Sequence, residues 1–524
     1  MADWIINRVL YVVWVAAAAF FFCTTIPARA EPEQQAVEVS PEQSGPKIVP
    51  SPSAPPALED ERVKLEASGD AAPAIKVLTG MEGSAAAPVQ KVSATHFMID
   101  VGGDESKNYF ACRIEGAAGR IVRIDVRRPR GGTRLWASLN PVYAEHVDIN
   151  DPESFLSPPQ RQVSTKDISH NKSRLPDTRS ERWHFAKDAW WDGHTFSVVQ
   201  RFHDNQVVLA MRYPLTPTLS DRILQNLGRL PDCKVIPIGQ SKQGRPLSAL
   251  KVGAGTEEQE KTKPCILVYA REHGNEQDAG WAALGAAEFI TAPDAPAAEL
   301  RRKYTFLIIP LLNPDDAFAG VYSNRHFGFR DKDKTDDAVA YSAWFLKWIG
   351  DGKRLDIAID LHNMESGEGA NLVCGFTENS AGRESACRQL HELIGQNCRQ
   401  SPVEVESDPR RNGWMSNRLG GWLSYRFGAL FMLYECNCQA GNAHLSLGEL
   451  KWMGGSMLKG TTDYLSSPAG AKFLSEVDAL RENRQMRIRL AGGLGDGDAI
   501  LQTERLKWSL PDALKFLREG KGAH

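Results

Sequence analysis

The chain has 524 residues, of which 42% are hydrophobic and 24% are charged, and its formal net charge is −3. This length suits two or three domains, and this composition is typical of a globular protein. Nucleic acids and anionic membrane surfaces favour partners with a basic face, so the balanced charge argues against both as partners. The composition leaves the oligomeric state open.

Residues 1–30 are predicted to be an export signal or a membrane anchor. Arg8 precedes an apolar run over residues 9–22, and residues 28–30 read Ala-Arg-Ala, which matches the A-x-A pattern of a cleavage site. The apolar stretch up to Ile26 approaches the roughly 20 residues that span a bilayer, so an uncleaved anchor is the alternative to a cleaved signal. Both interpretations predict an exported protein, periplasmic or secreted, and the anchor would tether it to a membrane.

Two regions of different composition follow the predicted signal. Residues 31–88 are rich in Pro, Ala, Glu and Ser, which predicts a flexible linker because few apolar side chains are present to offset the cost of ordering. Residues 89–214 contain short, β-branched segments that partly alternate between apolar and polar positions, which predicts an antiparallel β-sandwich domain. Three tryptophans of this region, Trp183, Trp190 and Trp191, are expected to pack in the core rather than to form a sugar-binding platform.

Eight cysteines follow the predicted signal. An even number in an exported protein permits disulfides, and buried free thiols fit the sequence equally well. No pair has the spacing of a zinc ribbon.

Residues 215–468 alternate between nearly continuous apolar strands and helical stretches. Strands are predicted at residues 233–239, 246–253, 265–270, 304–312, 355–362, 370–376 and 429–435, with helices between them that include residues 279–290 and 338–349. This pattern predicts an α/β fold in which helices cover both faces of a sheet. Ligands of such sheets bind beyond the carboxyl ends of the strands. Residues 469–524 are predicted to form a mixed, partly helical C-terminal extension.

Three of these predicted strands end in side chains that can bind or serve a metal ion. His273 and Glu276 follow the strand at 265–270, His362 ends the strand at 355–362, and Glu435 ends the strand at 429–435. Zinc binds histidine nitrogen and carboxylate oxygen, and a catalytic site uses three protein ligands. A single histidine at a strand end is usually structural, but three such strand ends together favour a zinc site. Glu435 is then the remaining base for a metal-activated water, and Asp360 is a candidate to fix a histidine tautomer.

Five sequence blocks resemble, in the same order, the motifs of the zinc carboxypeptidases. They read YAREHGNEQ at residues 269–277, PLLNPDD at 310–316, GVYSNRHFG at 320–328, IDLHN at 359–363 and YE at 434–435. The resemblance covers roughly residues 215–468 and implies a mixed β-sheet flanked by helices. A β-domain directly before the peptidase domain is similar to the layout of the cytosolic carboxypeptidases.

The resemblance also implies a reaction and its residues. His273, Glu276 and His362 would bind one zinc ion, as in carboxypeptidase A. Asn324 and Arg325 would bind the terminal carboxylate of a peptide or protein substrate, a task suited to a planar guanidinium group. Glu435 would take a proton from zinc-bound water and pass it to the leaving amine. The product would be a free C-terminal amino acid.

One arginine of the family motif is missing. Only ten residues separate Asn313 from Asn324, and none is arginine, whereas the cytosolic carboxypeptidases have a longer connection that carries the arginine stabilising the oxyanion. Arg330 or Arg418 could replace it. Arg418, which lies 17 residues before Glu435, is predicted to bind substrate.

Two other functions stay open at this point. The same site could cleave cell-wall peptides or N-acyl amino acids. Alternatively, the domain could be an inactive relative that binds peptides or glycans, which the missing arginine would support. The presence of all three ligands together with Glu435 argues against an inactive protein, since a domain without catalysis has no need of the base.

Overall fold

The computed structural model describes residues 73–102, 109–127, 136, 139–146, 182–321, 323, 327, 334–363, 371–376, 386, 389–390, 392–394, 405–407, 418–436 and 445–490. The predicted signal or anchor at residues 1–30 and most of the predicted linker lie outside these residues. No helix within the described ranges is long and apolar enough to cross a membrane.

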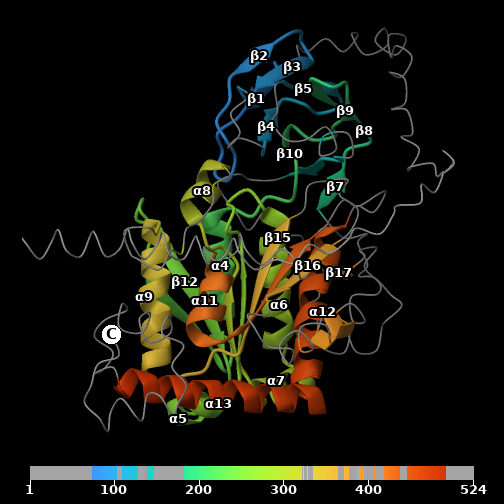
Figure 1. Cartoon of the computed structure of the whole chain (residues 1–524). Coiled ribbons are helices and arrows are strands. Elements are labelled where there is room, and N and C mark those ends of the chain that lie inside the picture. The colour runs from blue at the N-terminus through green and yellow to red at the C-terminus, as the bar shows by residue number, and fades with distance from the viewer. Residues whose placement is uncertain are drawn as a thin grey trace, which may run out of the picture. The chain divides into compact units, whose positions relative to one another are not determined.

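The N-terminal domain contains two five-stranded β-sheets (Figure 1). The first has the order β1 (Lys76–Leu78), β4 (Ala111–Glu115), β10 (Gln206–Ala210), β6 (Val142–Glu145) and β7 (Trp183–Phe185). The second has the order β2 (Val89–Lys91), β3 (His96–Asp100), β5 (Ile121–Arg127), β9 (Thr195–Arg201) and β8 (Asp188–Trp191). These sheets form the sandwich-like domain that the sequence predicted.

Two details of this domain differ from the prediction. Strands β3 and β5 pair in parallel, whereas all other neighbouring strands of the two sheets are antiparallel. The reason is that β4, which lies between them in the chain, belongs to the other sheet. In addition, β1 lies within the segment predicted as a linker, because its three residues pair with β4.

The tryptophans of this domain differ in their packing. Trp183 is buried in the core, and Trp191 is partly buried and packs against it. Trp190 is partly buried, and the guanidinium carbon of Arg123 lies 5.4 Å from its ring centroid. Core packing was therefore the correct expectation for Trp183 and Trp191.

The second domain is built on an eight-stranded mixed sheet (Figure 1). Its order is β11 (Cys233–Gln240), β12 (Pro246–Val252), β14 (Thr305–Ile309), β13 (Cys265–Ala270), β15 (Ile357–Asn363), β18 (Leu430–Cys436), β16 (Asn371–Phe376) and β17 (Val405–Ser407). The central strands β14, β13, β15 and β18 are all parallel. Their carboxyl ends therefore meet at one edge of the sheet.

Helices cover both faces of this sheet, as predicted. α6 (Gln277–Thr291) and α12 (Leu447–Leu465) share a core with one face, and α9 (Asp336–Gly350) and α11 (Leu419–Phe427) share a core with the other. The remaining described helices are α4 (Pro217–Leu227), α5 (Glu257–Thr262), α7 (Ala295–Lys303), α8 (Pro314–Ala319) and α13 (Pro468–Leu490).

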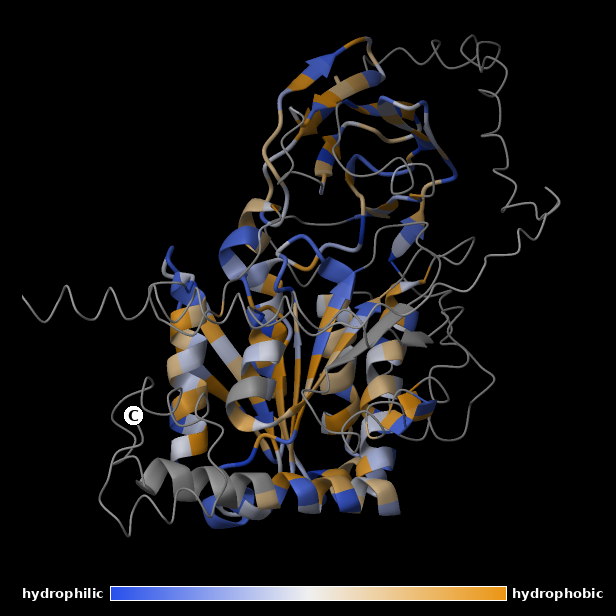
Figure 2. Cartoon of the chain, viewed as in Figure 1, coloured by the Kyte–Doolittle hydropathy of each residue, from blue (hydrophilic) through white to orange (hydrophobic). Residues whose placement is uncertain are grey.

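Strand β13 is an example of why the central strands consist almost entirely of apolar residues. All six of its residues are buried. Ile266, Val268 and Ala270 face one core, and Cys265, Leu267 and Tyr269 face the other, because successive side chains of a strand point to opposite faces. Figure 2 shows much of the central strands in orange, the colour of hydrophobic residues, as burial on both sides requires.

Four cysteines among the described residues form no disulfide, namely Cys112, Cys233, Cys265 and Cys436. Cys112, Cys265 and Cys436 are buried in the two cores. Burial raises the pKa of the Cys112 thiol to about 12, so it behaves as a small apolar side chain.

Candidate metal centre

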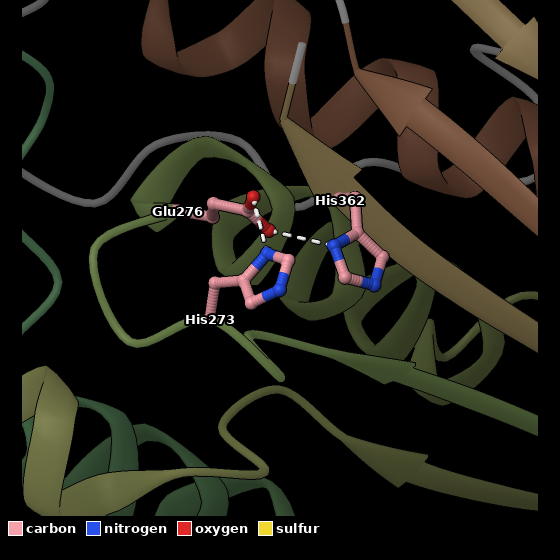
Figure 3. Close-up of side chains that lie close together, drawn as sticks. All are labelled: His273, Glu276 and His362. Atoms are coloured by element: carbon pink, nitrogen blue, oxygen red, sulfur yellow. Dashed lines mark hydrogen bonds and ion pairs between the residues drawn. The ribbon is translucent and has the colours of Figure 1, made fainter. Parts of the chain in front are cut away.

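The predicted zinc ligands lie at the carboxyl ends of two adjacent parallel strands. The loop after β13 carries His273 and ends at Glu276, which is the N-cap of α6. His362 lies near the end of β15, and Ala270 pairs with Leu361 in the parallel register of the two strands. Figure 3 shows the three side chains pointing toward one another.

The three side chains make a compact, buried cluster. His273 Nδ1 lies 2.8 Å from Glu276 Oε1, and His362 Nδ1 lies 2.9 Å from Glu276 Oε2. The two imidazole rings are 4.8 Å apart between centroids. None of the three residues is more than 8% exposed. The carboxylate of Glu276 therefore lies between two imidazoles, and both His273 and His362 direct Nδ1 toward it.

These residues fit a zinc ion in both chemistry and spacing. Two imidazole nitrogens and a carboxylate oxygen are a common zinc ligand set, with bonds of about 2.0–2.2 Å. Ligand atoms around a tetrahedral ion of that size lie about 3.3 Å apart. The two N···O distances of 2.8 and 2.9 Å are a few tenths of an ångström shorter. A small outward shift of the side chains would therefore make room for the ion.

The electrostatics of the cluster also favour a cation. Burial alone would raise the pKa of Glu276, but the positive charges of His273 and His362 hold it well below its usual range. Burial alone would lower the pKa of His362, but the carboxylates of Asp360 and Glu276 raise it well above its usual range. In the absence of a metal, the raised pKa of His362 keeps a proton, and with it a positive charge, beside this carboxylate.

Two further buried carboxylates border the ligands. Asp360 Oδ1 lies 3.2 Å from His362 Nε2, on the same face of β15 because the residues are two apart. If Asp360 accepts the Nε2 proton, Nδ1 of His362 is left to bind a metal, which is the function that the sequence suggested for Asp360. Glu272 also places a carboxylate oxygen within 4.8 Å of ligand atoms of Asp360 and His362.

Sequence reasoning missed Glu272. Its side chain is completely buried, and burial raises its pKa to about 8, while the charge of Arg418 acts in the opposite direction. Its only signal in the sequence is its position directly before His273. That position does not reveal whether the side chain points to solvent or to the centre.

Glu435 is brought to the same centre by strand register. β15 and β18 are parallel, and His362 pairs with Glu435. Side chains at paired positions of neighbouring strands lie on the same face of the sheet. Burial raises the pKa of Glu435 to about 8, although the charge of His362 acts against it.

Arg418 is the arginine that the structure brings to the ligands. It is the N-cap of α11, and its Nη1 donates a hydrogen bond of 2.9 Å to His273 Nε2. The same atom lies 3.5 Å from Glu272 Oε1. Asn324, Arg325 and Arg330 lie outside the described residues.

Comparisons with known proteins identify relatives of this chain. Residues 221–327 match the family described as zinc carboxypeptidase. Cytosolic carboxypeptidase 4 of Mus musculus is 29% identical over 199 residues, which are 36% of this chain and 17% of the mouse protein. Cytosolic carboxypeptidase 6 of Caenorhabditis elegans is 35% identical over 83 residues, which are 16% of this chain and 18% of that protein. The chain thus matches less than a fifth of the length of either relative.

Solved structures share the fold. A metallo-carboxypeptidase from Burkholderia cenocepacia is 17% identical with a TM-score of 0.59, and the match covers 75% of this chain and 99% of that protein. A metallo-carboxypeptidase from Pseudomonas aeruginosa is 15% identical with a TM-score of 0.56 and covers 74% of this chain and 100% of that protein. Both matches extend over more of the chain than the α/β domain alone.

Proposed function

We propose that this chain, whose residues 221–327 match the zinc carboxypeptidase family, is a zinc-dependent metallocarboxypeptidase. Its reaction is hydrolysis of the C-terminal peptide bond of peptides or proteins. The observation that carries this proposal is the meeting of His273, Glu276 and His362 at two strand ends, with Glu435 in register on the next strand.

The metal ligands are the two histidines and the glutamate of the buried cluster. His273 and His362 would bind through Nδ1 and Glu276 through its carboxylate, since these atoms face one another. Zinc, when bound, supplies a Lewis acid that polarises the scissile carbonyl and lowers the pKa of water. Asp360, 3.2 Å from His362 Nε2, would hold the ring so that Nδ1 is left to bind the ion.

Glu435 moves the proton that hydrolysis requires. Its carboxylate accepts a proton from water as the water oxygen bonds to the carbonyl carbon. It then gives that proton to the peptide nitrogen as the C–N bond breaks, so it ends the cycle as it began. Burial raises the pKa of Glu435 to about 8 in the metal-free protein, and the charge of a bound zinc ion would lower it toward the range in which the group can first accept and then donate a proton.

Arg418 is assigned to a substrate oxygen. A histidine that binds a metal through Nδ1 carries its proton on Nε2, and a guanidinium group has only donors. Arg418 therefore cannot keep its hydrogen bond to His273 Nε2 in the metal-bound protein. Its N–H group would turn to another acceptor, and we assign it the scissile carbonyl or the terminal carboxylate. Asn324 and Arg325 remain the proposed partners of the terminal carboxylate.

This position of Arg418 weakens the case for an inactive binding protein. That alternative rested on the lack of an arginine between Asn313 and Asn324. A cation within 3 Å of a metal ligand can supply the same charge from α11.

Export through residues 1–30 remains part of the proposal. It rests on the apolar run, on Pro27 and on the Ala-Arg-Ala sequence at residues 28–30. The mature N-terminus, determined by mass spectrometry after expression of the full chain, distinguishes a cleaved signal from an anchor.

The first experiment measures zinc and peptidase activity together. The full chain and Glu435→Gln are assayed for metal by mass spectrometry and for amino-acid release from a library of peptides with mixed C-termini. We expect one zinc per chain in both proteins and release only by the wild type. Zinc without release would instead support the alternative with cell-wall peptides or N-acyl amino acids. Absence of zinc would overturn the proposal.

A further inference from the structure

The last residues of the β-domain lie against the loop that carries two metal ligands. Leu215 follows this domain in the chain, and its backbone N–H donates to Gln277 Oε1. Its backbone carbonyl accepts a hydrogen bond from Arg271 Nη1. Arg271 and Gln277 directly flank the loop 272–276. A single residue between the two domains therefore bonds to both ends of this loop.

An ion pair connects the same segment to α6. Arg212 Nη1 lies 2.6 Å from Asp278 Oδ2, and the side chains are 7% and 3% exposed. Tyr213 also contributes, because its carbonyl accepts a 3.1 Å hydrogen bond from the indole of Trp281. We refer to residues 212–215 as the clamp. Its contacts hold the first turns of α6, directly after Glu276.

The ion pair of the clamp also reaches the second ligand strand. Asn363 Nδ2 donates to Asp278 Oδ2 at 3.2 Å, and Asn363 Oδ1 accepts from the backbone N–H of Ala279 at 2.8 Å. Asn363 follows His362 on β15. Asp278 thus joins Arg212 of the clamp to the residue beside His362, and both parts of the ligand set are linked to the clamp.

The loop itself is not in a relaxed conformation. Arg271 has a φ of 61°, in the left-handed region that costs a non-glycine residue of this size about 1 kcal/mol or more. Its side chain is completely buried and donates to Gly274 O as well as to Leu215 O. A strained backbone persists only where surrounding contacts enforce it. The hydrogen bond from Arg271 to the carbonyl of Leu215 is one of the contacts that hold the Arg271 backbone in this conformation.

We propose that the clamp positions the metal ligands, so that the end of the β-domain is a working part of the metal centre. Arg212 is a positioning residue in this proposal and acts through Asp278. The proposal rests on the metal site proposed above. It implies that the β-domain is no separable binding module, since its last residues set the geometry of His273, Glu276 and His362.

The test compares metal affinity with stability in the full chain. Arg212→Met removes the ion pair but keeps much of the side-chain volume. We expect zinc affinity, measured by competition with a chromophoric chelator, to fall about 10- to 100-fold, as is typical when a residue that orients metal ligands is lost. Arg212→Lys keeps the charge and should recover part of the affinity. Cobalt bound in place of zinc should show an altered visible absorption spectrum in Arg212→Met.

A matched control separates positioning from general stability. Arg354 makes an equally buried ion pair of 2.7 Å with Asp356, next to the opposite end of β15. Arg354→Met should lower the melting temperature of the metal-free protein to a similar extent and leave zinc affinity within about twofold of wild type. If Arg212→Met does not fold, Gln277→Met, which removes the acceptor for Leu215, takes its place.

The outcomes separate this proposal from the proposed function. A wild-type chain that binds no zinc contradicts the metal site itself. A wild-type chain that binds zinc, together with a folded clamp variant of unchanged affinity, overturns the positioning role of the clamp alone. Equal losses of affinity in the Arg212 and Arg354 variants would also overturn it, because the effect would then be one of stability.

Discussion

The β-domain and the metal centre bury carboxylates in opposite ways. In the β-domain, Asp125 accepts hydrogen bonds from Ser197 at 2.8 Å and from Arg123 at 2.8 Å, and it lies 2.7 Å from His96 Nε2. At the metal centre, the oxygens of Glu272 and Asp360 are buried without a hydrogen bond among the described residues, and their contacts are longer ion pairs of 3.5 Å with Arg418 and 3.2 Å with His362.

This difference separates a structural carboxylate from a functional one. Buried polar atoms in folded proteins are normally paired, because an unpaired one costs about 1–3 kcal/mol or more. Asp125 obeys this rule, and its cluster needs no further partner. Glu272 and Asp360, which lie beside the two histidines of the metal centre, do not obey this rule. Such a site gains most from an added cation, which is the distinction that the following experiments test.

The largest expected effect is the loss of metal-dependent stability in His362→Ala. Zinc at a hundredfold excess over its dissociation constant should stabilise the wild-type chain by about 2.7 kcal/mol. The variant lacks a ligand and should gain almost nothing. Urea unfolding with added zinc and with a chelator measures both. His96→Ala, which removes the histidine beside Asp125, is the control and should keep the full response to zinc.

A zinc response of the same size in His362→Ala would place the metal elsewhere and remove the contrast between the two regions. A reduced response in His96→Ala would show that the β-domain cluster also serves the metal.

The next largest effect concerns Arg418. Arg418→Met should keep one zinc per chain and lower kcat/KM for peptide hydrolysis about 100- to 1000-fold, the usual cost of losing an oxyanion donor. Arg418→Lys restores the charge without the planar fork and should recover only part of the rate. Zinc content and steady-state kinetics are the measurements. Arg245→Met, at a partly exposed ion pair with Asp315, is the control that should keep its activity. Unchanged kinetics in Arg418→Met would contradict the assignment.

The features that could be predicted are those determined by short stretches of the sequence. Continuous apolar runs indicated strands β13, β15 and β18, because a strand that is buried on both faces needs apolar residues at nearly every position. His273, Glu276 and His362 were found from residue types with a known metal preference at strand ends. Five sequence blocks in the same order as in zinc carboxypeptidases supported this choice of residues. In the structure, the three residues lie in one cluster.

The parts that could not be predicted depend on contacts between distant residues. Arg212 and Asp278 are 66 residues apart, and the sequence around neither residue indicates that they form an ion pair. Glu272 has the same difficulty, since its burial follows from packing and not from its neighbours in the chain. Strand β1 is only three residues long, which is too short for alternation to be recognised in a segment rich in proline and alanine.

A smaller effect is expected from the structural carboxylate. Asp125→Asn keeps the size of the side chain but removes its charge and one acceptor for Ser197, Arg123 or His96. The free energy of unfolding should fall by about 1–3 kcal/mol, the usual range for a hydrogen bond to a buried charged group. Zinc content and peptidase activity should not change, which distinguishes this carboxylate from those at the strand ends. Loss of zinc in this variant would mean that the two regions are not independent.

The smallest effect is the pH dependence of that difference. Burial would raise the pKa of Asp125, but hydrogen bonds from Arg123, Ser197 and His96 outweigh it and hold the pKa below its usual value. A carboxyl group whose pKa is lower in the folded protein stabilises the fold above its unfolded pKa of about 3.9, and this stabilisation is lost as the pH falls through the folded value. The gap in stability between wild type and Asp125→Asn should therefore shrink as the pH falls below about pH 4. Urea unfolding of the metal-free proteins at several pH values measures the gap. A gap that grows as the pH falls below about pH 4 would mean that Asp125 is held in its protonated form in the folded protein.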